Sequence, residues 1–138
     1  MFIKNTVSYI AAALLTALAR PGPPTGIYYA NINPQGTVCV EVTWVPDPDK
    51  DVRLEVRCGA RSKVSRDLTV DEGPPFVYKI DTHSEPVHSS FRQAANAVCL
   101  ELATMQAHDL YKFVYNRDSN TIVTAFQAQG VELRPGHC

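Results

Sequence analysis

The chain has 138 residues, and its 13 Lys or Arg against 14 Asp or Glu give a formal net charge of −1 with His neutral. Proteins that bind nucleic acids present clustered basic side chains to the phosphates. The densest basic stretch here, 57–66, has small polar residues between its charges. We therefore do not expect nucleic acid as a partner.

The first 19 residues read MFIKNTVSYIAAALLTALA. Lys4 precedes an apolar run, and Ala17-Leu18-Ala19 has the small residues of a cleavage site, which together indicate a secretory signal peptide. A membrane-spanning helix needs about 20 apolar residues, roughly twice this run. We expect a signal peptide over 1–19, a Pro/Gly-rich lead-in over 20–27 and one small domain over 28–138. This organisation predicts a secreted, extracellular, monomeric protein without a membrane span, with entry into host tissue or cells as a second option.

The hairpin predicted around Trp44 has a strict period of two. Val38, Val40, Val42 and Trp44 alternate with polar residues or cysteine, and the same holds for 52–58 beyond a turn rich in Pro and Asp. A slip of one residue would turn every apolar side chain outward. We therefore predict the pairs Trp44–Val52, Val42–Leu54, Val40–Val56 and Val38–Cys58.

Four cysteines follow the signal peptide, and an even count in a secreted chain indicates disulfides. Their wide spacing does not match a zinc site, so neither a metal nor a cofactor is expected. In the predicted hairpin Cys58 lies on the buried face and Cys39 on the other, which argues against a bond between them. The expected bonds are Cys58–Cys99, which ties a helix to the sheet, and Cys39–Cys138, which ties down the C-terminal tail.

The remaining elements are predicted from periodicity. Residues 59–73 are expected to be a loop, 75–80 a strand, and 89–105 a helix capped by Ser89 or Ser90. A second hairpin is expected over 111–115 and 121–126, with a short strand at 131–133. The predicted fold class is α+β, an antiparallel sheet of about five strands packed against one main α-helix, with two disulfides.

The densest ionisable stretch is HSEPVH, 83–88. Because Pro86 disfavours a regular helix between the two histidines, we expect a loop. His83 and His88 are candidates for a general acid and base, with Glu85 orienting one of them and Arg92 near an anion. Such a set suits RNA cleavage through the 2′-hydroxyl, and the alternative is a polar surface loop without a catalytic role.

Aromatic side chains give a third set of candidates. Trp44, Tyr111 and Tyr115 are able to form an exposed platform for a small ligand or a carbohydrate. The alternative is that either Trp44 or the aromatic residues of the second hairpin belong to the core.

The stretch LYKFVYNRDSNTIVTAFQ, 110–127, resembles the late hairpin of ribonuclease-like effectors of plant-associated fungi. The signal peptide, the small mature domain and the cysteine near the chain end also resemble secreted effector candidates of that group. The chain departs from the ribonuclease-like family because residues 27–31 (IYYAN) hold no cysteine and because its helix comes later. No catalytic residue is carried over from it.

These observations predict a secreted, non-enzymatic protein, an effector or virulence factor of fungal type, that binds a host or extracellular protein. A secreted ribonuclease-like hydrolase is the first alternative. An extracellular small-ligand or carbohydrate-binding module is the second.

Overall fold

The computed structural model describes residues 23–45 and 51–138. The expected signal peptide, the start of the lead-in and turn residues 46–50 lie outside the described residues. In chain order the elements are β1 (Gly26–Asn31), β2 (Val38–Trp44), β3 (Asp51–Cys58), β4 (Arg61–Val64), β5 (Leu68–Glu72), β6 (Val77–Ile80), α2 (Glu85–Cys99), the 3-10 helix η1 (Leu100–Leu102), β7 (Lys112–Asn116), β8 (Thr121–Phe126) and β9 (Gln129–Pro135).

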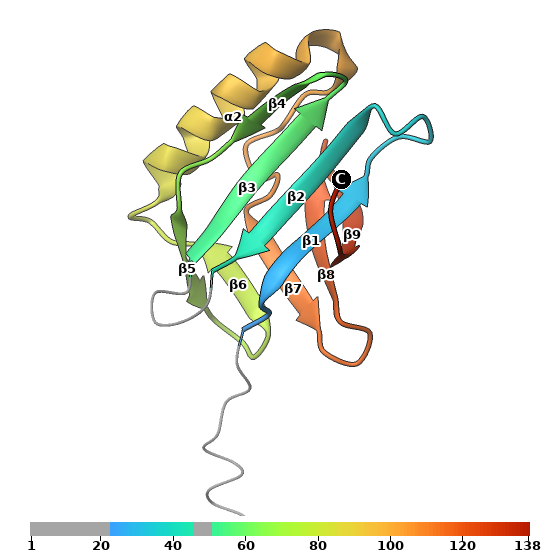
Figure 1. The fold of residues 1–138 in the computed structure, drawn as a ribbon. Helices are drawn as coiled ribbons and strands as arrows, with labels where there is room; N and C mark the ends of the chain where they lie inside the picture. The colour runs from blue at the N-terminus through green and yellow to red at the C-terminus, as the bar shows by residue number, and fades with distance from the viewer. Residues whose placement is uncertain (1–22, 46–50) are drawn as a thin grey trace, which may run out of the picture.

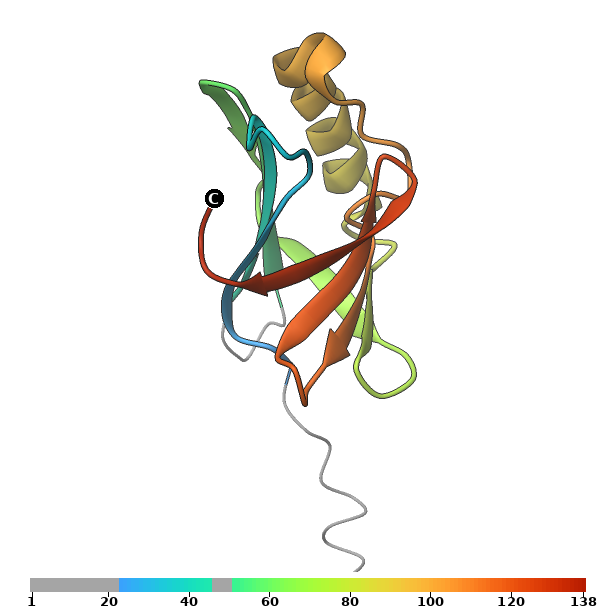
Figure 2. The same cartoon turned by 90° about the vertical axis from the view of Figure 1, so that its right-hand side faces the viewer.

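The described strands form an antiparallel β-barrel (Figures 1 and 2). Hydrogen-bonded neighbours follow the order β2-β1-β9-β8-β7-β6-β5-β3-β4, and β2 also pairs with β3. This last pairing closes eight strands into a ring, with β4 attached outside it along β3. The predicted α+β fold of about five strands is therefore wrong, because the protein is mostly β.

Three of the missed strands carry weak sequence signals. β4 exposes all four of its residues, so it has no apolar face for a period-two pattern to reveal. β5 places only Leu68 and Val70 in the core. In β1 the sequence GIYYAN does not alternate clearly between polar and apolar residues. The pairing of these short strands follows from tertiary contacts more than from local pattern.

The hairpin of β2 and β3 has the predicted register. Trp44 pairs with Val52, Val42 with Leu54 and Val40 with Val56. The side chains on this face are at most 2% exposed and form one wall of the core. The predicted register is confirmed, because it is the one that buries every apolar side chain of the hairpin.

Helix α2 begins at Glu85 and ends at Cys99, whereas the predicted helix covered 89–105. Pro86 lies in the first turn, where its missing N–H costs nothing, so the expected loop at 83–88 is wrong. After the helix, the Asn96 side chain exchanges two hydrogen bonds with the Met105 backbone, at 2.7 and 3.1 Å. These bonds hold the extended chain beside the helix in place of another turn.

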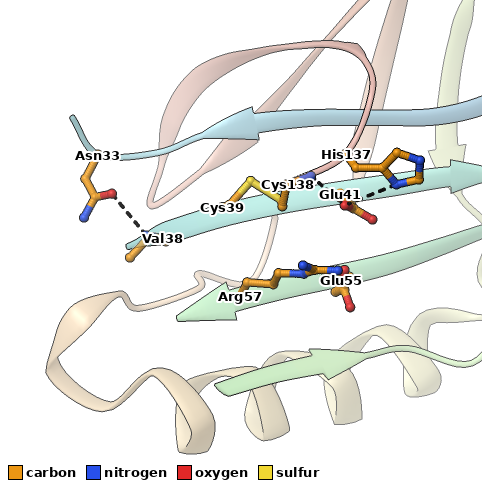
Figure 3. The surroundings of a disulfide bond; sticks show 8 residues. All are labelled: Asn33, Val38, Cys39, Glu41, Glu55, Arg57, His137 and Cys138. Carbon is orange, nitrogen blue, oxygen red and sulfur yellow. Dashed lines mark hydrogen bonds and ion pairs between the residues drawn. A yellow bond between two sulfur atoms is a disulfide. The ribbon is translucent and has the colours of Figure 1, made fainter. Parts of the chain in front are cut away.

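The two disulfides join Cys58 to Cys99 and Cys39 to Cys138, the same pairs that the face argument predicts. The first links β3 to the end of α2. The second lies on the outer face of β2, where the tail runs over Glu41 (Figure 3). Glu41 is 7% exposed and accepts a 2.7 Å hydrogen bond from the Cys138 N–H. The His137 ring lies 3.8 Å from the same carboxylate oxygen.

Gly136 allows the tail to cross the Tyr29 ring. Its φ is +135°, and a Cβ at this position would lie 2.8 Å from Cε1 of Tyr29. We expect Gly136→Ala to lower the free energy of unfolding by about 1–2 kcal/mol and to speed reduction of Cys39–Cys138. Urea unfolding and timed thiol reduction measure the two effects. Gly130→Ala is the control, because its Cβ meets nothing within 4 Å; equal effects of the two changes would contradict this account.

Within residues 23–45 and 51–138, no helix combines the length and apolar character needed to cross a membrane.

Candidate functional site

Three of the four predicted catalytic residues converge on one pocket. Glu85, His88 and Arg92 lie on one face of α2, because they are spaced three and four residues apart. With Ala107, His108 and Tyr111 they line a pocket of about 230 Å³. His83 lies before the helix, is exposed and does not line this pocket.

His88 is held inside the protein. Its ring is 3% exposed, and Nε2 lies 2.9 Å from the backbone carbonyl oxygen of Asp109. A carbonyl only accepts, so Nε2 carries the proton. Burial lowers the pKa of His88, although the carbonyls of Asp109 and Leu110 oppose this effect. The ring therefore acts as a neutral link between α2 and the 106–110 segment, and it does not form an acid–base pair with His83.

This neutral ring makes stability depend on pH. The unfolded chain protonates His88 near pH 6.5, whereas the folded ring has a lower pKa. The folded state thus loses stability as the pH falls through about 6.5. We expect His88→Gln to flatten the slope of the unfolding free energy between pH 7.5 and 5.5, measured by urea unfolding. His83→Gln, at an exposed position, should retain the slope; a slope retained by both variants would contradict the assignment.

Tyr111 lies at the centre of the pocket. Its hydroxyl donates to Glu85 Oε1 at 2.7 Å, and this bond, more than burial, raises the pKa of Tyr111. The rings of His88 and His108 stand edge-on to it at centroid distances of 5.4 and 5.6 Å. The other polar side chains that line the pocket are those of Ser89, Arg92 and His108. The pocket therefore suits an anionic group better than two-histidine chemistry.

Trp44 belongs to the core and not to an exposed platform. It is 2% exposed and packs edge-on against Tyr78 and Phe113, with centroids 5.2 and 5.7 Å away. Tyr115 is partly buried, and its hydroxyl bonds to the Asn120 side chain at 2.9 Å. Trp44, Tyr111 and Tyr115 therefore do not share one binding surface.

The outer face of β6, β7 and β8 carries a feature that sequence reasoning missed. Val77 pairs with Val114, and Val114 pairs with Val123, so the three side chains form one row across the strands. Val114 and Val123 are 39% and 44% exposed. In the next row on the same face, Lys79 pairs with Lys112. We call these five residues the valine face.

The sequence held a signal for the valine face. The buried residues Phe113 and Ile122 are each followed by a valine at a position that alternation assigns to the outside. An apolar residue at an outward position of two adjacent strands indicates a contact surface.

Comparison with protein-family models, curated proteins and solved structures finds no match. The function must therefore be inferred from the molecule itself. In the part of the chain that the structure describes, no group of His, Cys, Asp and Glu side chains is arranged to hold a metal ion.

Proposed function

We propose that the protein is a secreted, non-enzymatic binding protein of effector type, and that its valine face contacts a protein of the host or of the extracellular space. The observation that carries this proposal is the row of Val77, Val114 and Val123, which lies in register across three strands. Water contacts this row in the free protein, and a partner that covers it gains about 25 cal/mol for each Å² of apolar surface removed from water.

The two lysines of the valine face support a partner with acidic side chains. Lys79 and Lys112 stand directly opposite each other across the strands. Like charges in this position repel each other. On its other side Lys79 stands opposite Asp71 of β5, and its Nζ lies 5.9 Å from the centroid of the Tyr111 ring, so the free protein compensates part of this repulsion. Carboxylates of a partner would neutralise both charges beside the apolar row.

The state of His88 supports binding over catalysis. Its proton is committed to the Asp109 carbonyl, and the ring is buried. His88 is therefore not placed to act as the second residue of an acid–base pair with His83. The buried Trp44 likewise argues against the carbohydrate-binding alternative.

The test uses a photo-reactive residue at position 123, and at position 35 as control, in the intact oxidised protein. Both proteins are applied to extracts of plant tissue, because the sequence resembles effectors of plant-associated fungi. The crosslinked partner is identified, purified and titrated against the unmodified protein. We expect crosslinking at position 123 but not 35, and at least a tenfold loss of affinity in the double variant Val114→Lys/Val123→Lys.

Gln35→Lys is the matched control, because Gln35 is an exposed residue between β1 and β2, outside the valine face. It should retain full affinity for the purified partner. Equal crosslinking from both positions, or equal affinity of the double variant and the parent, would refute the proposal. A parent dimer that the double variant converts to monomer would also refute it, because the face would then join two copies of this chain.

A ribonuclease-like hydrolase remains the second candidate, favoured by the convergence of Glu85, Arg92 and His108 on one pocket. Cleavage of RNA by the oxidised protein, lost in Arg92→Gln and His108→Gln, would support it. Absence of cleavage, or cleavage that survives both changes, would remove it.

A further inference from the structure

β4 is the open edge of the sheet. In the strand order it comes last, beside β3 alone, and all four of its side chains are exposed. Proteins usually cover or distort such an edge, because its unpaired backbone groups are a template for another strand. Here the edge is neighboured by helix α2 (Figure 1).

The backbone groups that face this open edge are those of Ser62 and Val64. The Ser65 N–H donates to the Leu54 carbonyl of β3 at 2.7 Å. Bonding directions alternate along an antiparallel strand, so Lys63 also directs its N–H and C=O toward β3. Ser62 and Val64 direct theirs away from it, and among the described residues no hydrogen bond reaches these outward groups.

A groove of about 440 Å³ runs between this edge and the first half of α2. On the strand side it is lined by 63–66, and on the helix side by Pro86, Val87, Phe91 and Ala94 among others. The Cys58–Cys99 bond joins β3 to the far end of α2, which keeps the helix at a fixed position along the strand. The groove is therefore a preformed feature with an apolar floor.

The charge around the groove has one sign. Arg53 and Arg57 of β3 have carboxylate partners, Asp67 and Glu55 respectively. Among the described residues no such partner is found for Arg61, Lys63 or Arg66, which lie along β4 and just after it. No Asp or Glu lines the groove. The groove thus combines an open strand edge, an apolar floor and a cationic rim.

We infer that this groove binds an extended, acidic segment of a partner protein by strand addition. The segment pairs with the outward backbone groups of Ser62 and Val64 as an additional antiparallel or parallel strand. Because side chains alternate along it, every second residue faces the groove, where apolar residues can cover the floor. Lys63 stands opposite buried Val56 and so lies on the same side as the floor, and there an acidic residue of the segment can meet it. This site is separate from the valine face and does not depend on the proposed function.

The probe is the acetylated and amidated hexapeptide Val-Ser-Glu-Ser-Val-Ser, whose valines and glutamate share one face of an extended strand, titrated into the oxidised protein by NMR. We expect saturable shifts of the Ser62 and Val64 amides, and hydrogen exchange of both slowed at least tenfold at saturation. A second peptide has the same sequence with every other amide N-methylated, which blocks backbone pairing. It should bind at least tenfold more weakly.

Two charge-reversal variants distinguish the groove from the valine face. Lys63→Glu/Arg66→Glu should weaken hexapeptide binding at least tenfold, whereas Lys79→Glu/Lys112→Glu should leave it unchanged. All four lysine and arginine side chains are exposed, so neither variant disturbs the core. Loss of binding only in the second variant would place the peptide on the valine face and overturn the inference.

Equal binding of the two peptides would also overturn it, because strand addition requires free amides, as would no binding at millimolar peptide. Dimerisation of the protein through β4, detected by sedimentation and abolished by Val64→Pro, would show that a second copy occupies the edge and would likewise refute it. None of these outcomes bears on the valine face, which is tested with its own variants.

Discussion

Replacing Cys58 and Cys99 together with alanine is expected to lower the free energy of unfolding by about 4 kcal/mol. The bond closes a loop with a sequence separation of 41 residues, for which chain entropy alone predicts this amount. Domains of this size have a total stability of about 5–15 kcal/mol. Urea unfolding of the oxidised parent and variant measures the loss.

The variant Cys39→Ala/Cys138→Ala is the matched control. Both variants lose one disulfide, but only the first frees α2 from the sheet. We expect amide hydrogen exchange in α2 to become faster in the Cys58/Cys99 variant and to stay protected in the control. Similar exchange of α2 in both would mean that the helix is held by packing alone, against the role assigned to this bond.

Asp109→Asn should cost about 3 kcal/mol. The Asp109 carboxylate is in a residue only 1% exposed and accepts hydrogen bonds from the backbone N–H groups of Gln106, Gln127 and Ala128, at 2.6, 2.6 and 3.1 Å. An asparagine amide replaces one acceptor oxygen with a donor, so at least one of these partly buried N–H groups loses its partner. The loss is measured by urea unfolding at pH 7.

Two of these bonds support the turn between β8 and β9. Gln127 and Ala128 have φ values of +55° and +59°, a conformation that favours glycine or asparagine. Without the carboxylate, this turn is expected to exchange its amides faster as well. Asp118→Asn, at an exposed turn position, is the control; a comparable loss of stability there would show that the effect is not specific to the buried acceptor.

The elements that the sequence predicted correctly are those with a strict local period. In the first hairpin every alternate residue from Val38 to Trp44 is apolar or aromatic, and only one register buries them all. The same alternation places Cys39 and Cys58 on opposite faces of the hairpin. It therefore predicts that each forms a disulfide with a more distant cysteine, as observed. Such patterns need no knowledge of distant segments, which is why they succeed.

The barrel was not predictable in this way. β4 is a polar edge strand, and β3 meets β5 through only two residue pairs, Asp51–Thr69 and Val52–Leu68. Neither strand pairing has a period that distinguishes it from a loop. The start of α2 was missed because Pro86 was treated as an interruption, although proline is favourable in a first helical turn.

Among the candidate site residues, the i, i+3 and i+7 spacing of Glu85, His88 and Arg92 places them together once the helix start is known. The contribution of His108 and Tyr111 depends on a chain reversal after the helix. The burial of His88 depends on the Asp109 carbonyl, which no sequence pattern indicates. The sequence thus indicated which residues were candidates for a site, but it did not indicate how deeply each is buried or which groups it bonds to.

The narrow seam between β1 and β9 has a consequence for how the chain acquires its shape. Only Tyr28–Pro135 and Tyr29–Arg134 pair there, and they join the two ends of the described chain. Contacts between such distant segments form slowly, because the entropy of closing the loop must be overcome first. The hairpins β2–β3 and β7–β8 can form locally, so ring closure is expected to limit the refolding rate. Until it occurs, β1 and β9 present open edges on which newly made chains can associate.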